Sequence, residues 1–443
     1  MKSIKLFSLI LAVAMLFNLC GCSVFTVDTN ELLSPPELTG ELAPIAEALS
    51  KKADAGYVLK YPSGGNYHSA VIQNDINGDG VFEAFALYST VEGDVTYMHI
   101  NVILNKSGEW ISVADQKVVA GGVDSIDFSD INSDGVQEIL VGWSVYGTTE
   151  KQLAVYTLSG EVLSQRMLQR YTHFLCADMN KDNENEIFIV NFNVVENLNY
   201  AALYNLTDNG VEEISRCALD SGIESVSAPL LSTLSNGTPA IYIDEIKGAG
   251  AITEVVFMEK NTLVNPLLSS NTGQNILTLR SATIASRDIN DDGIIEIPIQ
   301  SVLPSVFYKN HETLYYTDWY SFNGEMLTRQ LCTIMNFDDG YYVEVPSKLQ
   351  GKLSVLKDTD KHIRIFYEYD EQTETIGEEI ARIQAVSEAL WDRKDYDKNG
   401  LSELARSGGT VFAFKISASN AEKKELTEQL KKSFKLMNQE AIG

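Results

Sequence analysis

Basic residues, cysteines and long apolar runs are all scarce in this 443-residue chain, and each shortage argues against a class of protein. Only 34 Lys and Arg stand against 61 Asp and Glu, which gives a formal net charge of −27. A surface this acidic repels phosphate, so we expect no nucleic-acid partner. Intrinsic disorder is also disfavoured, because 44% of the residues are hydrophobic and can bury a core.

The five cysteines do not form a framework for disulfides or zinc. Cys176, Cys217 and Cys332 are widely spaced, odd in number and without a CxxC pair. Each lies in an apolar or strand-like run. We therefore expect these three residues to be small members of the core.

The N-terminus has the features of a secretion signal. A basic start, Met1–Lys5, precedes an apolar run of 14 residues, Leu6–Leu19, which is short for a membrane span. The run ends in Leu19-Cys20-Gly21-Cys22, which resembles the lipobox of bacterial lipoproteins. The resemblance implies a signal peptide over residues 1–21 and a lipid on Cys22, so that the body is extracytoplasmic and anchored to the bacterial cell membrane. The alternative is an ordinary signal peptide with incidental cysteines.

An internal repeat organises the middle of the chain. Three runs share the pattern D-x-N-x-D-G-x-x-E, a fourth has Asn in place of the Gly, and a fifth has lost its acids. The clean runs begin at residues 75, 130 and 288, the run with Asn at 178, and the decayed run at 232. Successive gaps are 55, 48, 54 and 56 residues. A period this steady indicates repeated architecture.

Strand-like segments flank each copy of the repeat. Around the second copy they are Val123–Phe128, Glu138–Trp143, Gln152–Tyr156 and Glu161–Ser164, the last two separated by a tight turn at Ser159-Gly160. Four short strands in about fifty residues are typical of a β-propeller blade. The repeat resembles the FG-GAP/VCBS family of propeller repeats. The fold class expected is mainly β, with a propeller of about five four-stranded blades, or more.

Four domains follow from these patterns. Residues 1–21 form the signal peptide, and residues 22–54 form a stalk with a short helix at Glu41–Lys52. Residues 55–335 form the propeller, and residues 336–443 form a small α+β domain. In that last domain we expect helices over Glu378–Leu390, from apolar spacings of three and four, and from a capping box at Ser419–Glu422 onward.

The repeated run has the chemistry of a Ca²⁺ loop. Asp, Asn and Asp at alternate positions put oxygen atoms inside one turn, and the Glu at position nine adds a carboxylate. Position twelve is apolar in every acidic copy, which excludes an EF-hand. The alternative is a set of Asx-turns that bind no ion. The predicted ligands are Asp75, Asn77, Asp79, Glu83, Asp130, Asn132, Asp134, Glu138, Asp178, Asn180, Asp182, Glu186, Asp288, Asn290, Asp292 and Glu296.

Two related runs are expected to differ from these four. The decayed copy at Ser232 should bind nothing, because it has no acids. A further match at Asp395–Glu403 has different flanks, and we favour a plain polar turn there. The aromatic stretch Tyr315–Tyr320 has the spacing of blade packing, with sugar stacking as the alternative.

No catalytic residues can be assigned from the sequence. The five His residues form no HExxH or HxH pair, and neither a GxSxG motif nor a P-loop occurs. His68 and His173 hold corresponding places before two strands, where they face a channel or simply lie on the surface.

The leading hypothesis is a lipid-anchored binding or scaffold protein whose calcium-stabilised propeller presents a face to an envelope protein or glycan. The alternative is an envelope polysaccharide-active enzyme, a lyase or hydrolase, that uses the propeller channel. A third hypothesis places the interaction in the C-terminal domain.

Overall fold

The computed structural model describes residues 40–193, 196, 198–304 and 313–437. The predicted signal peptide and Cys22 lie outside the described residues, as do 194–195, 197, 305–312 and 438–443. The chain divides into two compact units. One contains the residues up to Ile126 together with Leu158–Leu163, and the other contains Asp127–Thr157 together with the residues from Ser164 onward.

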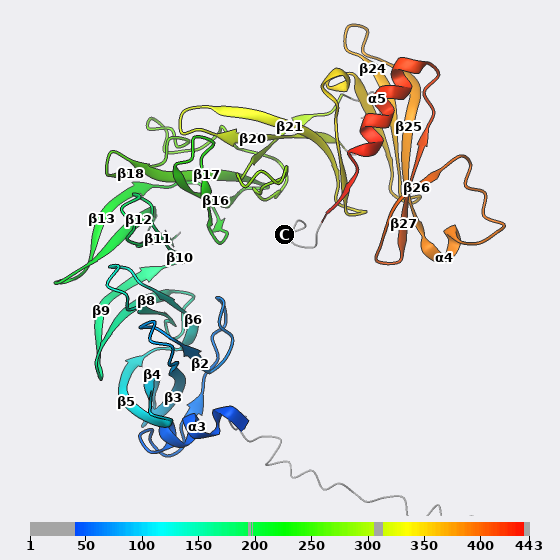
Figure 1. Ribbon diagram of the computed structural model, residues 1–443. Helices are drawn as coiled ribbons and strands as arrows, with labels where there is room; N and C mark the ends of the chain where they lie inside the picture. Colours follow the sequence, from blue (N-terminus) through cyan, green and yellow to red (C-terminus); the bar gives the residue numbers. More distant parts are fainter. Residues whose placement is uncertain (1–39, 194–195, 197, 305–312, 438–443) are drawn as a thin grey trace, which may run out of the picture. The chain divides into compact units, whose positions relative to one another are not determined.

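Antiparallel β-sheets make up most of the described chain, which confirms the mainly β prediction (Figure 1). The first sheet has the order β1-β3-β4-β5, and β2 also pairs with β3. Its strands are β1 (Val58–Leu59), β2 (Val71–Asn74), β3 (Glu83–Glu92), β4 (Val95–Lys106) and β5 (Glu109–Val119).

Helix α3 (Ala43–Ser50) packs against the first sheet, after the 3-10 turn η1 (Gly40–Leu42). Ile45 and Leu49 of this helix are fully buried in a cluster with Tyr88. The short helix predicted at Glu41–Lys52 is therefore confirmed.

The second and third sheets each have four strands in chain order. The second contains β6 (Gly122–Ser129), β7 (Glu138–Ser144), β8 (Lys151–Ser159) and β9 (Val162–Tyr171). The third contains β10 (His173–Ala177), β11 (Glu186–Asn193), β12 (Leu198–Thr207) and β13 (Gly210–Ala218). The strands predicted around the second repeat are thus confirmed. The predicted turn is present as well, with Gly160 in the left-handed region at φ 61°.

The fourth and fifth sheets follow the same plan. The fourth contains β14 (Ser225–Val226), β15 (Leu230–Thr233), β16 (Pro239–Lys247), β17 (Gly250–Glu259) and β18 (Thr262–Val264). The fifth contains β19 (Ile297–Val302), β20 (Tyr315–Phe322), β21 (Leu327–Asn336), β22 (Tyr341–Glu344) and, from the C-terminal end, β28 (Lys435–Leu436). Each of the first five sheets therefore contains one copy of the repeat.

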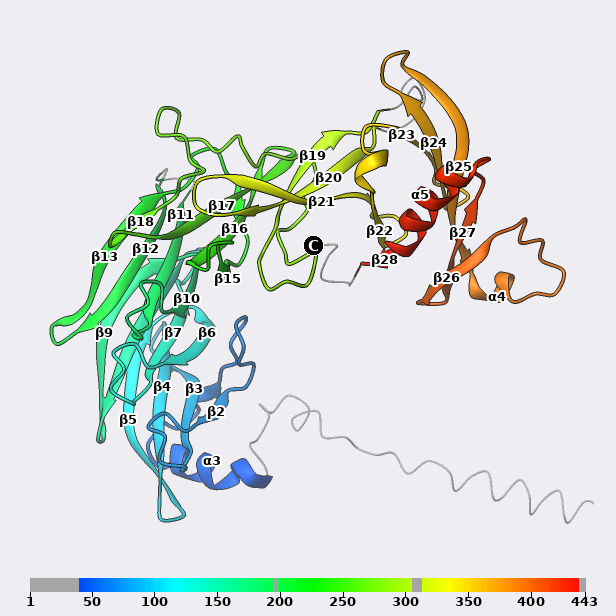
Figure 2. The ribbon, with the colours of Figure 1, turned by 45° about the horizontal axis from the view of Figure 1, so that its top comes forward.

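The sixth sheet has the order β23-β24-β25-β27-β26. Its strands are β23 (Leu353–Asp358), β24 (Ile363–Asp370), β25 (Thr375–Ser387), β26 (Ser402–Ser407) and β27 (Thr410–Ile416). The 3-10 turn η2 (Ser347–Leu349) precedes the sheet, and α4 (Glu388–Trp391) follows β25. Helix α5 (Ala421–Lys432) lies across β25 and β27 (Figures 1 and 2). This combination of strands and a helix agrees with the α+β character predicted for the C-terminal segment.

The helix predicted over Glu378–Leu390 is wrong, because most of that segment is strand β25. Ile380, Ile383 and Val386 are all at most 5% exposed, and β25 is paired on both edges, with β24 and β27. A strand buried on both faces does not alternate apolar and polar residues, so its spacing can imitate a helix. The closing helix is confirmed, but its N-cap is Asn420, whose side chain accepts from Lys423 N.

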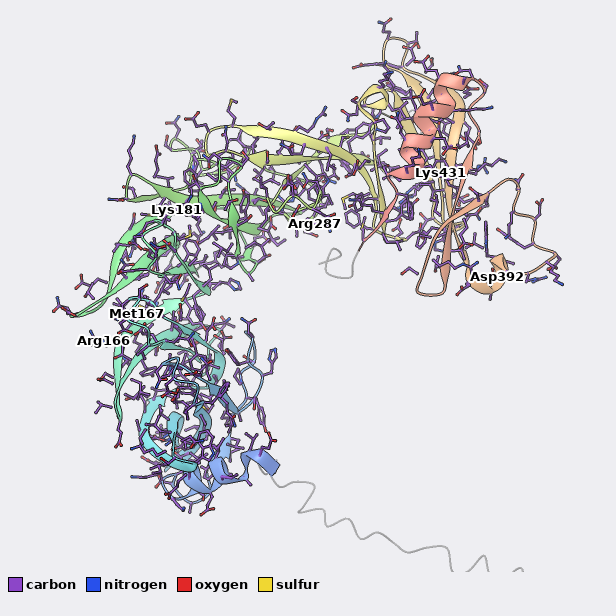
Figure 3. The ribbon with its side chains drawn as sticks, viewed as in Figure 1. Arg166, Met167, Lys181, Arg287, Asp392 and Lys431 are labelled. Atoms are coloured by element: carbon purple, nitrogen blue, oxygen red, sulfur yellow. The ribbon has the colours of Figure 1, made fainter. Side chains whose placement is uncertain are left out.

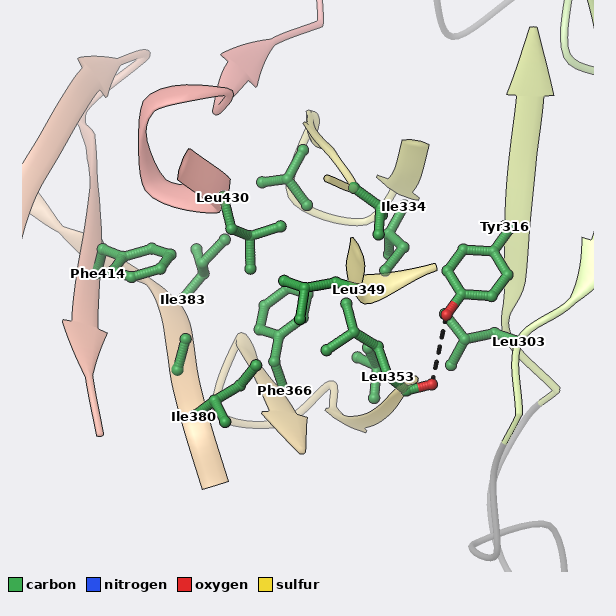
Figure 4. Packing of buried hydrophobic residues seen from close by; sticks show 14 of the residues in the cluster. Leu303, Tyr316, Ile334, Leu349, Leu353, Phe366, Ile380, Ile383, Phe414 and Leu430 are labelled. Atoms are coloured by element: carbon green, nitrogen blue, oxygen red, sulfur yellow. Dashed lines mark hydrogen bonds between the residues drawn. The ribbon is translucent and has the colours of Figure 1, made fainter. Parts of the chain in front are cut away.

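Apolar clusters lie between consecutive sheets of the second unit. One joins the second and third sheets, one the third and fourth, and one the fourth and fifth. The sixth sheet shares a further core with β20–β22, shown in Figure 4. In this core Tyr316 donates to the Leu353 carbonyl at 3.4 Å. Cys176, Cys217 and Cys332 are free thiols within these cores, as predicted.

Candidate functional sites

Three of the acidic repeats form the turn between two strands of their sheet, and the fourth, at Asp288, is closed by an isolated bridge between Arg287 and Glu296. The run at Asp75 follows β2, the run at Asp130 follows β6, and the run at Asp178 follows β10. In these three, the Glu at position nine is the first residue of the next strand, and in the fourth run Glu296 directly precedes β19. The structure therefore brings together the residues that the sequence groups in each loop.

The first Asp of each run organises the turn. Asp75 accepts hydrogen bonds from Asp79 N at 3.1 Å and from Gly80 N at 2.9 Å. The same pair of bonds recurs in the other three loops. Position six needs a left-handed backbone, and Asn183 adopts it at φ 70° where the other loops have Gly. Asn183 thus supplies the turn that the sequence required of it.

The Glu at position nine has a role that the sequence did not reveal. Its carboxylate accepts the backbone N–H of position two, for example Glu138 from Ile131 N at 2.9 Å. Glu138 is 3% exposed, and Glu186 and Glu296 are fully buried. Burial raises the pKa of all three to about 7, although the backbone hydrogen bond acts in the opposite direction. Burial likewise raises the pKa of Glu83.

The loops therefore form Asx-turns, and they retain oxygen atoms that suit a cation. A carboxylate has about four lone-pair sites, so one N–H on each oxygen leaves acceptor capacity for Ca²⁺. Within the described ranges, no three His, Cys, Asp or Glu side chains converge as they would around a bound metal. Calcium binding at these loops stays a prediction.

Neighbouring loops of the second unit are hydrogen-bonded in chain order. Ser133 Oγ donates to the Asn183 carbonyl at 2.7 Å, and Lys181 Nζ, labelled in Figure 3, donates to the Gly237 carbonyl at 2.9 Å. Ser232 Oγ then donates to the Gly293 carbonyl at 3.3 Å. The loops at 130, 178, 232 and 288 therefore lie side by side, including the decayed copy.

The two related runs form polar turns. In the decayed copy, Asn236 accepts from Thr238 N at 2.9 Å. Near the C-terminus, Asp397 accepts from Asn399 N at 2.9 Å, while Asp395 pairs with Arg393. In both runs these side-chain oxygens therefore have partners within the chain.

A chain of polar side chains crosses the first sheet. His99 contacts Asp115 through Nδ1 at 2.7 Å and Thr90 Oγ1 through Nε2 at 2.8 Å. Tyr88 stacks on the His99 ring and donates to Asp115. Burial alone would raise the pKa of Asp115, but hydrogen bonds from His99, Tyr88 and Asn101 lower it. Thr90 and His99 are each 5% exposed whereas Asp115 is exposed, so this chain of groups leads from the interior of the first sheet to its surface on β5.

A hollow of about 360 Å³ opens at the other end of β7 and β11 from the acidic loops. It is lined by Thr149–Lys151, Arg170–Thr172 and Asn191–Asn193. Strand β7 begins at Glu138, beside its loop, and ends at Ser144. Seven residues at about 3.3 Å each separate loop and hollow by roughly 20 Å, so a loop cation would not touch a ligand in the hollow.

The walls of the hollow are held by their own hydrogen bonds. Phe192 N donates to Thr172 Oγ1 at 2.9 Å, and Asn191 Nδ2 donates to Tyr200 OH at 3.2 Å. Arg170 pairs with both Glu150 and Glu196, so its charge is balanced. The ammonium group of Lys151 lies over the Tyr171 ring, 5.6 Å from its centroid, and the half-buried ring of Phe192 also lines the hollow.

These lining residues were not identified from the sequence. They come from the ends of three strands that are far apart in the chain, and none belongs to a recognisable motif. Of the His residues considered, His173 contacts the Val226 carbonyl at 3.1 Å and His68 is exposed. In the aromatic stretch, Tyr316 and Trp319 are buried, in agreement with packing.

The C-terminal sheet carries a larger open groove of about 820 Å³. It lies beside the start of α5 and is lined by residues of both charges, including Lys352, Glu368 and Lys423. Lys423 is held by Glu368 and Glu378 at 2.9 and 2.8 Å. The groove leaves open the third hypothesis, in which the C-terminal domain carries the interaction. In the described part of the chain, no helix has both the length and the apolar character to cross a membrane.

Comparisons with known proteins give only distant likenesses. No family model and no curated protein matches the chain. The exotype rhamnogalacturonan lyase YesX is 10% identical with a TM-score of 0.29, over 74% of this chain and 63% of that one. The Bacillus licheniformis rhamnogalacturonan lyase PL11 is 11% identical with a TM-score of 0.30, over 79% of this chain and 85% of that one. A Lactobacillus plantarum protein is 8% identical with a TM-score of 0.30, over 71% and 84%.

This chain therefore spans less than two thirds of YesX. At these TM-scores nothing about its fold or function is taken from the likenesses.

Proposed function

We propose that this protein is a lipid-anchored, extracytoplasmic binding protein that takes a neutral glycan in the hollow at Thr149–Lys151, Arg170–Thr172 and Asn191–Asn193. The observation that carries the proposal is a preformed hollow in which Arg170 is paired with two glutamates and which is lined by amide and hydroxyl groups and by aromatic side chains. Sugars present hydroxyl groups to hydrogen bonds and an apolar ring face to an aromatic side chain.

The five repeat-containing sheets act as propeller blades in this proposal. Consecutive sheets of the second unit share cores, and their repeat loops, the decayed one included, touch in chain order, as blades around an axis would require. Ca²⁺ at the four acidic loops offsets repulsion between their carboxylates. Its role is structural, because the loops and the hollow lie at opposite ends of the same strands.

A glycan array that holds neutral and uronic-acid oligosaccharides tests the binding proposal. We expect a neutral oligosaccharide to bind, and Phe192→Ala or Asn193→Ala to weaken that binding by about tenfold, the loss expected for about 1.4 kcal/mol. Phe82→Ala is the matched control, because Phe82 is 52% exposed and belongs to the other unit.

Unchanged affinity in both hollow variants would refute the assignment of the hollow. Cleavage of the bound oligosaccharide, detected as new reducing or unsaturated ends, would instead favour the polysaccharide-active enzyme.

A further inference from the structure

Two glutamates lie close together inside the fourth sheet, away from its decayed loop. Glu245 on β16 is 1% exposed and Glu254 on β17 is fully buried. In the register of these strands Glu245 faces Ile252 and Glu254 faces Ile243, so both carboxyl groups are on one face, one diagonal step apart. That face packs on the third sheet, since Ile243 shares a cluster with Phe188 and Leu203.

The charges around this pair do not balance. Asp220 is also fully buried, and Lys247 binds it at 2.6 Å. Asp220 therefore uses the one cation of this face, and Glu245 and Glu254 keep no Lys or Arg partner among the described residues. The opposite face is neutral by itself, because Arg280 pairs with Asp244 at 2.9 Å.

Glu254 is held in place by two donors. Asp220 N donates to its Oε2 at 3.0 Å, and Asn265 Nδ2 donates to its Oε1 at 2.6 Å. Asn265 Nδ2 also donates to the Ala218 carbonyl at 3.1 Å. Because both neighbours of the amide are acceptors, its NH₂ group must face them. The carbonyl oxygen of Asn265 therefore faces neither of these two acceptors.

Three buried oxygens at this place then have no N–H donor within the described chain. They are both carboxyl oxygens of Glu245 and the Oδ1 of Asn265. An unmade hydrogen bond to a buried acceptor costs about 1 to 3 kcal/mol, and more for a charged group. Proteins pair such groups, or use them to bind a ligand. A donor or a cation is therefore required here.

One occupant is a proton. Burial raises the pKa of Glu245 well above its ordinary range, and in the metal-free chain the protonated acid donates to Glu254. A shared proton satisfies one oxygen of Glu245 and leaves one negative charge on the pair. The other oxygen of Glu245 stays without a donor in that state. A divalent cation beside the pair satisfies both oxygens of Glu245 and balances both charges.

We propose that Glu245 and Glu254, the latter held in place by Asn265, form a buried Ca²⁺ site between the third and fourth sheets, distinct from the acidic loops. The two carboxylates supply up to four hard oxygen ligands of the kind that Ca²⁺ takes. The site lies near the end of β16, whereas the decayed loop at Ser232–Ala240 lies at its start. The fourth sheet, whose loop has lost its carboxylates, would thus bind calcium at a different position.

The test is calcium stoichiometry, measured by equilibrium dialysis at about 1 mM free calcium, where extracellular calcium modules are loaded. Glu245→Gln keeps the size of the neutral acid, so the metal-free variant should fold with an unchanged melting temperature. We expect it to bind one calcium fewer per chain than the wild type. Glu254→Gln should lose the same ion, and Glu259→Gln, at an exposed position on β17, should lose none.

The difference is independent of how many loops bind calcium, because all the loops are intact in these variants. Bound calcium that is unchanged in Glu245→Gln would overturn the proposal and leave the pair as a shared proton. A wild-type protein that binds no calcium would overturn it as well.

Discussion

Replacing Glu138 with Gln separates the effect of a buried charge from the effect of calcium. Glu138 begins β7 and accepts Ile131 N at 2.9 Å, a bond that the carbonyl oxygen of Gln can keep. Burial, together with repulsion from Asp134 and Asp130, raises its pKa from 4.5 to about 7. In the absence of calcium, the folded chain therefore has to hold a charge there above pH 7 that it disfavours.

The sign and size of the change in unfolding free energy follow from the linkage between proton binding and folding. An acid whose pKa is raised by folding contributes stability below its unfolded pKa, and this contribution is lost as the pH rises from about 4.5 to about 7. The full gap corresponds to about 3.4 kcal/mol as an upper bound, at about 1.4 kcal/mol per pKa unit. Relaxation that admits water reduces it, so we expect about 1 to 2 kcal/mol.

Calorimetry in EDTA at pH 5 and pH 7.5 measures the effect. At pH 7.5 Glu138→Gln should melt about 2 to 4 °C above the wild type, and at pH 5 the two should coincide. Excess calcium should reverse the order at pH 7.5, because the cation favours the carboxylate. Glu325→Gln, at an exposed turn, controls for the loss of one charge. A difference that is the same at both pH values would refute the reasoning.

Three further predictions test the rest of the molecule. Asp130→Ala with Asp134→Ala should remove part of the calcium-induced rise in melting temperature, and a rise equal to that of the wild type in calorimetry would contradict calcium binding at this loop. Cys22→Ser should move the protein from the membrane fraction to the soluble fraction on cell fractionation, whereas full retention would place the anchor elsewhere. Leu430→Ala should lower the free energy of unfolding by about 2 to 5 kcal/mol, because Leu430 of α5 is fully buried in the core beneath that helix. Leu390→Ala, at a 38% exposed position, should change it by less than about 0.5 kcal/mol, and equal losses in urea unfolding would contradict the packing shown in Figure 4.

The repeat made the first five sheets predictable. Its turn chemistry is local, so a run such as Asp130–Glu138 determines both the loop and the first residue of the next strand. The same locality explains why Asn183 could be expected to replace Gly. Where an element depends on partners far along the chain, the prediction from the sequence was wrong. Strand β25 reads as a helix because both of its faces and both of its edges are covered.

The candidate sites divide in the same way. The loop ligands are contiguous in sequence, and they were found. The hollow and the pair Glu245–Glu254 are assembled by strand register and by packing between sheets, which no short pattern records. An acid with a cation partner is indistinguishable from one without in the sequence Asp244-Glu245, where Asp244 pairs with Arg280 and Glu245 lies beside Glu254.

The acidity of this chain therefore has two physically different parts. Carboxylates in the loops are partly exposed and hydrogen-bonded to backbone N–H groups, so water and salt moderate their repulsion even without calcium. The acids at position nine and the pair in the fourth sheet are buried, where water moderates the cost of their charge much less. It is these buried acids that should make stability depend on pH when calcium is absent, and make it independent of pH when calcium is bound. A protein held outside the cytoplasm, as the lipobox resemblance implies, would meet both variables directly.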